Sequence, residues 1–118
     1  MTKCGLFGDN LKDPMQTWGG GAELFRYGGS VKTGTRIGYG NGFKSRAKIT
    51  ASQYEEILRQ FSGKEVPVGT SINNPPTGSV GEWVKANINK SGLMSYIGAI
   101  LVHEGLAVKP RRGWIRFV

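Results

Sequence analysis

The last forty residues contain signals for two helices followed by a short basic β-hairpin, and this order constrains the fold more than any other feature. Ser79–Glu82 has the capping-box pattern that opens a helix, in which the Ser and Glu side chains accept hydrogen bonds from free backbone N–H groups. Gly105 is suited to end the next helix, because glycine adopts the left-handed backbone that closes helices. Strand-like residues 106–108 and 114–118 flank a turn at 109–113. We therefore expect helix, tight turn, helix and hairpin.

A further helix is predicted to begin at Thr50. Thr50 and Gln53 form a second capping-box pattern, and the apolar residues that follow recur at the spacing of one helix face. Gly63 ends this predicted helix, and residues 65–70 indicate a short strand. That strand belongs at a sheet edge because Pro67 has no N–H to donate. The predicted core of residues 50–118 consists of Tyr54, Leu58, Phe61, Trp83, Ile88, Leu93, Ile97, Ile100, Leu101, Ile115 and Phe117.

Glycine separates the first part of the chain from the rest. Eleven of the nineteen glycines fall in residues 1–42, where they disfavour helix. Bulky and polar residues alternate over 23–27, 35–39 and 43–49, which is typical of short strands. We expect a Gly-rich basic N-terminal extension, 1–49, made of short strands or loops, either packed on the rest or partly disordered. The domain proper is predicted to span residues 50–118.

The order helix, strand, helix, helix, strand, wing, strand over Thr50–Val118 resembles the winged-helix class of helix-turn-helix domains. This resemblance implies an α+β, winged-helix-like fold that binds DNA. It implies that the helix Ser91–Glu104 is the recognition helix, which inserts into the major groove. It also implies that the wing, through Lys109, Arg111 and Arg112, contacts phosphates or the minor groove.

The charge of the chain indicates a polyanionic partner. Sixteen Lys and Arg against eight Asp and Glu give a net charge of +8, which attracts nucleic acid by long-range field and counterion release. No acidic residue lies between Leu24 and Tyr54, and none follows Glu104. We expect the two acid-free groups to form one binding surface together. The candidate nucleic-acid-binding residues are Lys44, Arg46, Lys48, Lys90, Ser91, Ser95, Lys109, Arg111 and Arg112.

The predicted recognition helix has little with which to read bases. With Ile97 at the centre of its buried face, the opposite face has no Arg, Asn or Gln for bidentate contacts with purines. Ala99 and Val102 on that face suit close approach to a groove, but equally suit packing against the N-terminal segment or another subunit. We therefore expect a small basic DNA-binding protein that contacts mainly phosphates, as a transcriptional or mobile-DNA accessory factor. The alternative is a protein-interaction or assembly module on the same scaffold, and a homodimer is a further hypothesis.

Three aromatic residues lie among the basic residues of the extension. Tyr27, Tyr39 and Phe43 alternate with cations, so they either stack on bases or anchor the glycine-rich segment to the core. Sequence alone leaves both interpretations open.

Other classes of function are disfavoured. Cys4 and His103 are the only cysteine and histidine, and neither has a metal-ligand spacing, so we expect no metal, no cofactor and no enzyme activity. The first residues lack the apolar segment of a signal peptide, and the apolar stretch 93–106 is too short to span a bilayer. We expect a cytoplasmic protein without a membrane partner.

Overall fold

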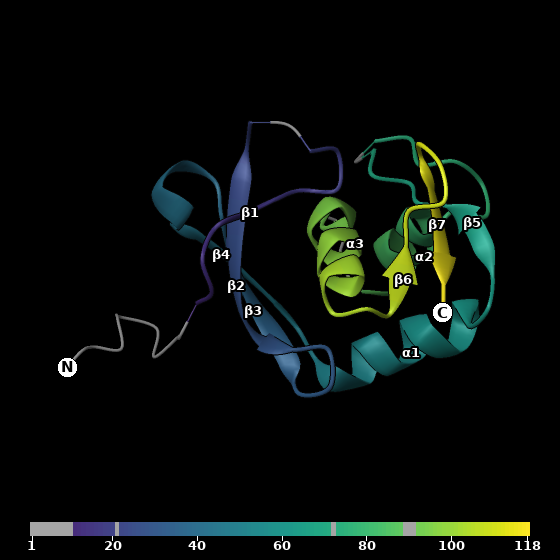
Figure 1. The fold of residues 1–118 in the computed structure, drawn as a ribbon, viewed down its shortest axis with the longest axis horizontal. Helices are drawn as coiled ribbons and strands as arrows, with labels where there is room; N and C mark the ends of the chain where they lie inside the picture. The colour runs from purple at the N-terminus through teal and green to yellow at the C-terminus, as the bar shows by residue number, and fades with distance from the viewer. Residues whose placement is uncertain (1–10, 21, 72, 89–91) are drawn as a thin grey trace.

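The computed structural model describes residues 11–20, 22–71, 73–88 and 92–118, which form an α+β fold with three α-helices and two antiparallel sheets (Figure 1). The elements in chain order are β1 (Met15–Gln16), β2 (Leu24–Ser30), β3 (Gly34–Tyr39), the 3₁₀ turn η1 (Asn41–Phe43), β4 (Ser45–Ile49), α1 (Ala51–Phe61), β5 (Glu65–Pro67), α2 (Val80–Asn87), α3 (Met94–His103), β6 (Ala107–Val108) and β7 (Trp114–Phe117).

The glycine-rich segment is a sheet in the described residues, with strand order β1-β2-β3-β4. The β2–β3 hairpin pairs Ser30 with Gly34 and Gly29 with Thr35. Both glycines have positive φ, 83° for Gly29 and 92° for Gly34, which residues with a side chain rarely adopt. Glycine therefore forms the tight end of this hairpin. The sequence left open whether this segment packs on the rest of the chain or is partly disordered. Strands β2, β3 and β4 pack on the rest of the chain.

Helix α1 begins with the predicted capping box. The backbone N–H of Gln53 donates to Thr50 Oγ1 at 3.1 Å, and the N–H of Thr50 donates to Gln53 Oε1 at 2.9 Å. The apolar stripe then faces inward, with Tyr54 and Ile57 fully buried and Leu58 half-buried. Local sequence thus determines both where this helix starts and which face it buries.

Helix α2 has a variant of the predicted cap. Ser79 Oγ accepts from the N–H of Glu82 at 3.1 Å, but the Glu82 side chain accepts from the N–H of Gly78 at 2.8 Å rather than from Ser79. The C-terminal sheet has strand order β5-β7-β6, with β5 at the edge predicted from Pro67. Strands β6 and β7 form the predicted hairpin, in which Ala107 pairs with Phe117.

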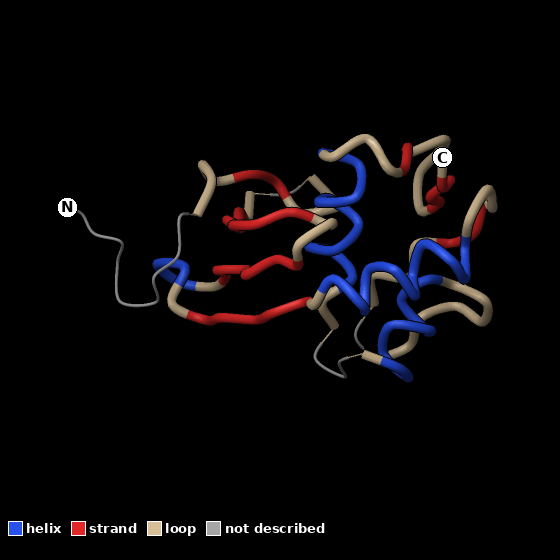
Figure 2. Tube along the Cα trace, turned by 90° about the horizontal axis from the view of Figure 1, so that it is seen from below, coloured by secondary structure: helices blue, strands red, loops and turns tan. Residues whose placement is uncertain are grey.

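Helix α3 lies between the two sheets (Figures 1 and 2). The sequence predicts it over Ser91–Glu104, whereas the helix begins at Met94 and ends at His103, so the predicted start is wrong. Gly92 lies just before the helix with a φ of 72°, a left-handed backbone that a right-handed helix does not contain. Most of its circumference is buried: Ile97, Ile100 and Leu101 face one way, and Tyr96 contacts Phe25 of β2 at 5.2 Å between ring centroids.

The buried residues form one core that includes both the N-terminal strands and residues 50–118. Of the predicted core, Leu58, Trp83 and Ile88 are half-buried and the others are buried. The prediction omitted the contribution of the N-terminal half, which is Trp18, Phe25, Tyr27, Val31, Ile37 and Ile49.

Candidate nucleic-acid interface

The outer face of the N-terminal sheet displays two rows of residues that cross three strands in register, and we call it the sheet face. The rows consist of Arg26, Gly38 and Arg46 in one, and Gly28, Arg36 and Lys48 in the other. Side chains alternate between the faces of a strand, so these residues point away from the buried Phe25, Tyr27 and Ile37.

The three strands that form the sheet face, β2, β3 and β4, contain no Asp or Glu. Arg36 and Lys48 are exposed and pair directly across β3 and β4. Neighbouring strands lie about 4.8 Å apart, so the backbones of Arg26 and Arg46 are separated by about 10 Å. Gly38, which lies between them, is buried, and the Arg46 side chain and Leu11 occupy the space over it: a Cβ at Gly38 would lie 2.9 Å from Arg46 Nη1 and 3.3 Å from Leu11 Cδ1. The result is a cluster of positive charge on one face of the sheet.

Backbone carbonyls orient two of these cations. Arg26 Nε donates to the carbonyl of Lys12 at 2.7 Å, and its Nη2 donates to that of Leu11 at 3.2 Å. A carbonyl has no net charge, so these bonds fix the guanidinium without neutralising it. Arg46 Nη1 similarly donates to the carbonyl of Phe43.

The aromatic residues of this segment differ in their roles. Tyr27 is fully buried, and its hydroxyl donates to Glu104 Oε2 at 2.7 Å, so it cannot stack on a base. Tyr39 packs on Tyr96 with 5.1 Å between ring centroids. Only Phe43, half-buried beside Arg26, has its ring near the cations of the sheet face, at 5.9 Å from the Arg26 guanidinium. The sheet face thus suits phosphates better than a row of stacked bases.

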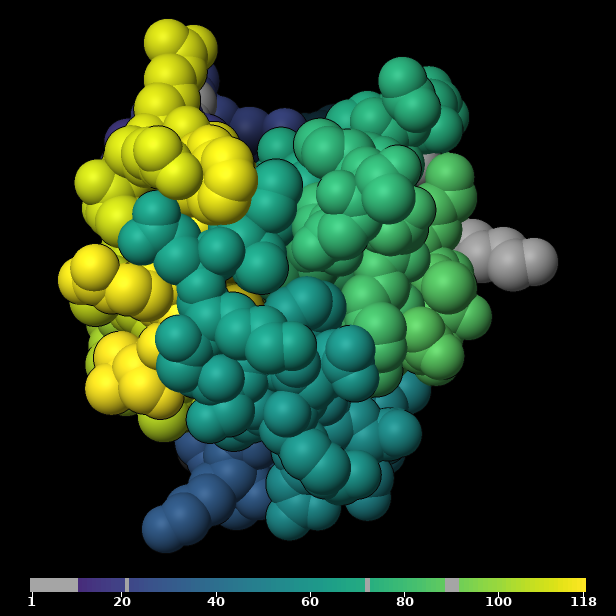
Figure 3. Space-filling model, turned by 90° about the vertical axis from the view of Figure 1, so that its right-hand side faces the viewer, coloured from purple at the N-terminus to yellow at the C-terminus, as the bar shows by residue number. Residues whose placement is uncertain are grey.

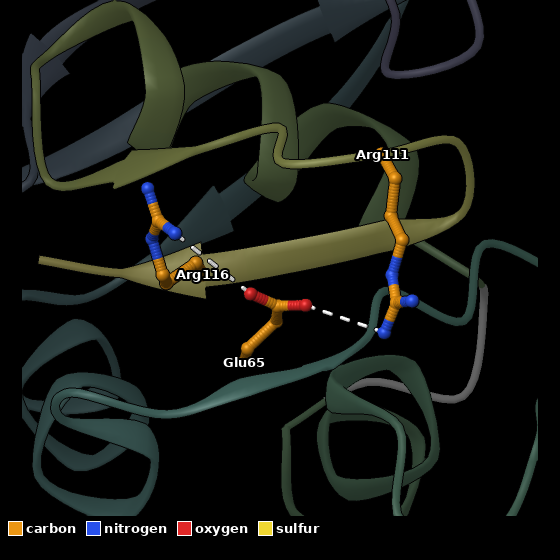
Figure 4. Close-up of polar contacts among 3 residues, drawn as sticks. All are labelled: Glu65, Arg111 and Arg116. Atoms are coloured by element: carbon orange, nitrogen blue, oxygen red, sulfur yellow. Dashed lines mark ion pairs between the residues drawn. The ribbon is translucent and has the colours of Figure 1, made fainter.

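The second basic group lies on the β6–β7 hairpin, and we call it the hairpin surface. It consists of Lys109, Arg111, Arg112 and Arg116. Glu65 of β5 lies between two of them, with Oε2 at 3.3 Å from Arg111 Nη2 and Oε1 at 3.9 Å from Arg116 Nη1 (Figure 4). The Arg111 guanidinium also lies over the Trp114 ring at 4.1 Å.

Lys109 and Ser95 are engaged by the N-terminal segment. Lys109 Nζ donates to the carbonyl of Trp18 at 2.7 Å and lies 4.7 Å from the centre of its ring. The backbone N–H of Trp18 donates to the carbonyl of Ser95 at 2.9 Å, in the first turn of α3. Lys44 is exposed just before β4, whereas Lys90 and Ser91 lie outside the described residues.

The N-terminal segment therefore covers part of the α3 face that lies opposite the buried Ile97, so this part of the face is not open to solvent. Trp18, which is 6% exposed, lies against Gly98, and a Cβ at Gly98 would approach Trp18 Cε3 to 2.7 Å. Beside it lies an open hollow of about 260 Å³ lined in part by Ala99, Val102 and His103. Met15 and Trp18 line the same hollow, so the N-terminal segment lies beside Ala99 and Val102.

The structure does not join the two basic groups into one surface as expected. The N-terminal sheet and the β6–β7 hairpin lie on opposite sides of α3 in two perpendicular views (Figures 1 and 2). From the side opposite the N-terminal sheet, the visible face is built largely of α1, β5, α2 and the C-terminal strand (Figure 3). The cause is that α3 occupies the space between the two sheets.

Four residues that shape these surfaces are absent from the candidate residues predicted from the sequence. Arg26 and Arg36 belong to the predicted basic group, and their place between buried residues of an alternating pattern is the signal that assigns them to the outer face. Trp18 and Glu65 had no comparable local signal, since their contacts are with residues distant in sequence.

Comparison of the chain with models of known protein families, with curated proteins and with solved structures found no match. Within the described residues no His, Cys, Asp and Glu side chains cluster in a way that could hold a metal ion, and no helix could cross a membrane.

Proposed function

We propose that this protein binds duplex nucleic acid, DNA above all, mainly through its phosphate backbone. The observation that carries this proposal is the sheet face, where four Lys and Arg side chains lie in register on three strands that contain no carboxylate. Such a cluster binds polyanions by releasing condensed counterions, whatever the base sequence.

A winged-helix interpretation of residues 50–118 supports the same function. This interpretation is supported by the order α1, β5, α2, α3, β6, β7 and by the strand order β5-β7-β6, and it assigns the β6–β7 hairpin as the wing. This chain departs from the class in one respect: Trp18 covers part of α3, the helix that would read bases. With that face closed, little base reading is expected, and contacts to phosphates dominate. A role in transcription or as an accessory factor of mobile DNA stays a prediction.

The test is the salt dependence of binding to a random-sequence duplex, measured by fluorescence anisotropy. Log K should fall linearly with log salt concentration, and Arg36→Gln with Lys48→Gln should reduce that slope by about 1.8, because each lost phosphate contact contributes about 0.9. The matched control, Lys32→Gln with Arg59→Gln, removes two exposed cations that lie outside both basic surfaces. Absence of duplex binding by the wild type at low salt would refute the proposal.

The alternative, a protein-interaction module, is favoured by one observation. The outward stripe of α3 is apolar, and the segment that covers it leaves a hollow beside Ala99 and Val102. Under this alternative, Val102→Glu would abolish binding of a protein partner while leaving the salt slope on DNA unchanged.

A further inference from the structure

The sheet face and the hairpin surface are two separate basic surfaces of one small molecule, and their separation has a consequence for what they bind. The inner face of the N-terminal sheet packs on α3, where Phe25 and Tyr39 contact Tyr96. The cations on its outer face therefore point away from α3.

The hairpin surface faces elsewhere. Ile115 and Phe117 on β7 are buried, and the Phe117 ring stacks on Phe61 of α1 at 5.6 Å. Arg116 alternates with these residues and is exposed on the opposite side of β7. The hairpin lies across α3 from the N-terminal sheet (Figures 1 and 2).

A duplex cannot follow both surfaces at once. Its persistence length is about 150 bp, whereas the longest dimension of this molecule, 44 Å, matches little more than one helical turn of about 34 Å, so over this length the duplex behaves as a nearly straight rod. Contact with one surface leaves the other, with its charge, directed at solvent. Glu65 offsets only part of the hairpin charge, since this single carboxylate is shared by Arg111 and Arg116 while Arg112 is exposed.

We infer that one molecule of this protein holds two duplex segments at the same time, one on the sheet face and one on the hairpin surface, and so bridges DNA. This inference rests on the proposed function and adds a second activity to it, the pairing of separate duplexes.

The test is a bridging assay with the full chain. A random-sequence duplex is immobilised on beads, protein is added, and capture of a second, fluorescent duplex is measured. The wild type should capture the second duplex. Two double variants each remove two positive charges from one surface. Arg36→Gln with Lys48→Gln changes the sheet face, and Arg111→Gln with Arg112→Gln changes the hairpin surface. Each should still bind one duplex in anisotropy but lose at least ten-fold in capture, while Lys32→Gln with Arg59→Gln captures like the wild type.

The outcomes separate the two proposals. Binding of a single duplex without capture of a second overturns bridging and leaves the proposed function intact. No duplex binding at all overturns both. If either single-surface variant still bridges, the second duplex is held by another copy of the chain rather than by the other surface, and the inference is wrong. Circular dichroism of each variant establishes that it is folded.

Discussion

At the scale of single residues, Glu104 connects parts of the chain that are distant in sequence. Its two carboxylate oxygens accept from the Tyr27 hydroxyl at 2.7 Å and from the Val31 N–H at 3.0 Å. These bonds attach the β2–β3 hairpin to the end of α3. Burial, followed by the hydrogen bond to Glu104, raises the pKa of the Tyr27 hydroxyl well above its usual range.

The raised pKa of Tyr27 predicts a loss of stability in alkali. Above pH 10 the unfolded chain releases the phenolic proton while the folded chain keeps it, so the free energy of unfolding falls as pH rises, by about 1.4 kcal/mol per pH unit from this group. In Tyr27→Phe this contribution is absent. Denaturant unfolding at a series of pH values from 9 to about 11.5 should show the variant's stability falling less steeply than that of the wild type. Parallel curves would contradict the prediction.

Ile97 and Leu101 provide the second test at this scale. Both are fully buried on the inward face of α3. Truncation of either to Ala should lower the free energy of unfolding by about 2–5 kcal/mol, because the cavity left behind adds to the lost burial. Ala86, exposed on α2, provides a control, since Ala86→Ser should change the midpoint of urea unfolding very little.

At the scale of elements, the close approach of residues 15–20 to α3 depends on the absence of a side chain at Gly98. The Trp18 ring occupies the place where a Cβ would lie. Trp18 is held there by its N–H bond to Ser95 and by Lys109. One face of α3 is thus covered by the N-terminal segment of the same chain.

Gly98→Ala tests this arrangement. Ala is the better helix former by about 1 kcal/mol, but the new methyl group must displace Trp18, and such overpacking costs about 1–3 kcal/mol. We expect a net loss of stability. In a Trp18→Ala background the clash is absent, so the same substitution should stabilise the protein. A double-mutant cycle by urea unfolding measures both signs, and equal effects in the two backgrounds would show that the ring does not contact Gly98.

At the scale of the whole molecule, Glu65 makes the net positive charge of the two basic surfaces unequal, because it lies on the hairpin surface. Its carboxylate offsets charge on Arg111 and Arg116, both of which are exposed. The position of the two basic surfaces on opposite sides of α3 also keeps like charges apart, which limits their mutual repulsion within a small fold.

Replacing Glu65 with Gln should strengthen binding to duplex DNA. The substitution removes the carboxylate that competes with phosphate for two guanidinium groups, so the affinity should rise and the salt dependence should steepen. Stability should change by less than about 1 kcal/mol, because both ion pairs are solvent-exposed. Glu82→Gln on α2 removes the same charge away from both basic surfaces and should leave the salt slope near that of the wild type.

Self-association stays a prediction at this scale. Strand β4 is an unpaired edge of the N-terminal sheet in the described residues, and such edges invite pairing. Light scattering at high micromolar concentration should show a dimer if this edge is used. A monomer over the whole concentration range would remove the hypothesis.

The sequence by itself determined the local features of this protein. The capping residues, the apolar spacing of α1, the edge position of Pro67 and the hairpin turn were predictable, because each depends on residues a few positions apart. The alternation of residues along β2, β3 and β4 likewise indicates which side chains lie on the sheet face, although the predicted candidate residues include only Arg46 and Lys48 of this face and not Arg26 and Arg36. The start of α3, predicted at Ser91, was wrong: the helix begins at Met94, because Gly92 before it has a positive φ.

Only the tertiary structure decided which surfaces are open and where they lie. Lys109 and Trp18 are in contact although they lie 91 positions apart in the sequence, and Tyr27 and Glu104 are in contact although they lie 77 positions apart. No local sequence pattern therefore predicts either contact. The same holds for the placement of α3 between the sheets, which separates basic groups that sequence reasoning had joined. A periodic pattern fixes which residues share a face of one element, but the direction of that face depends on what packs behind it, and this is set by the whole chain.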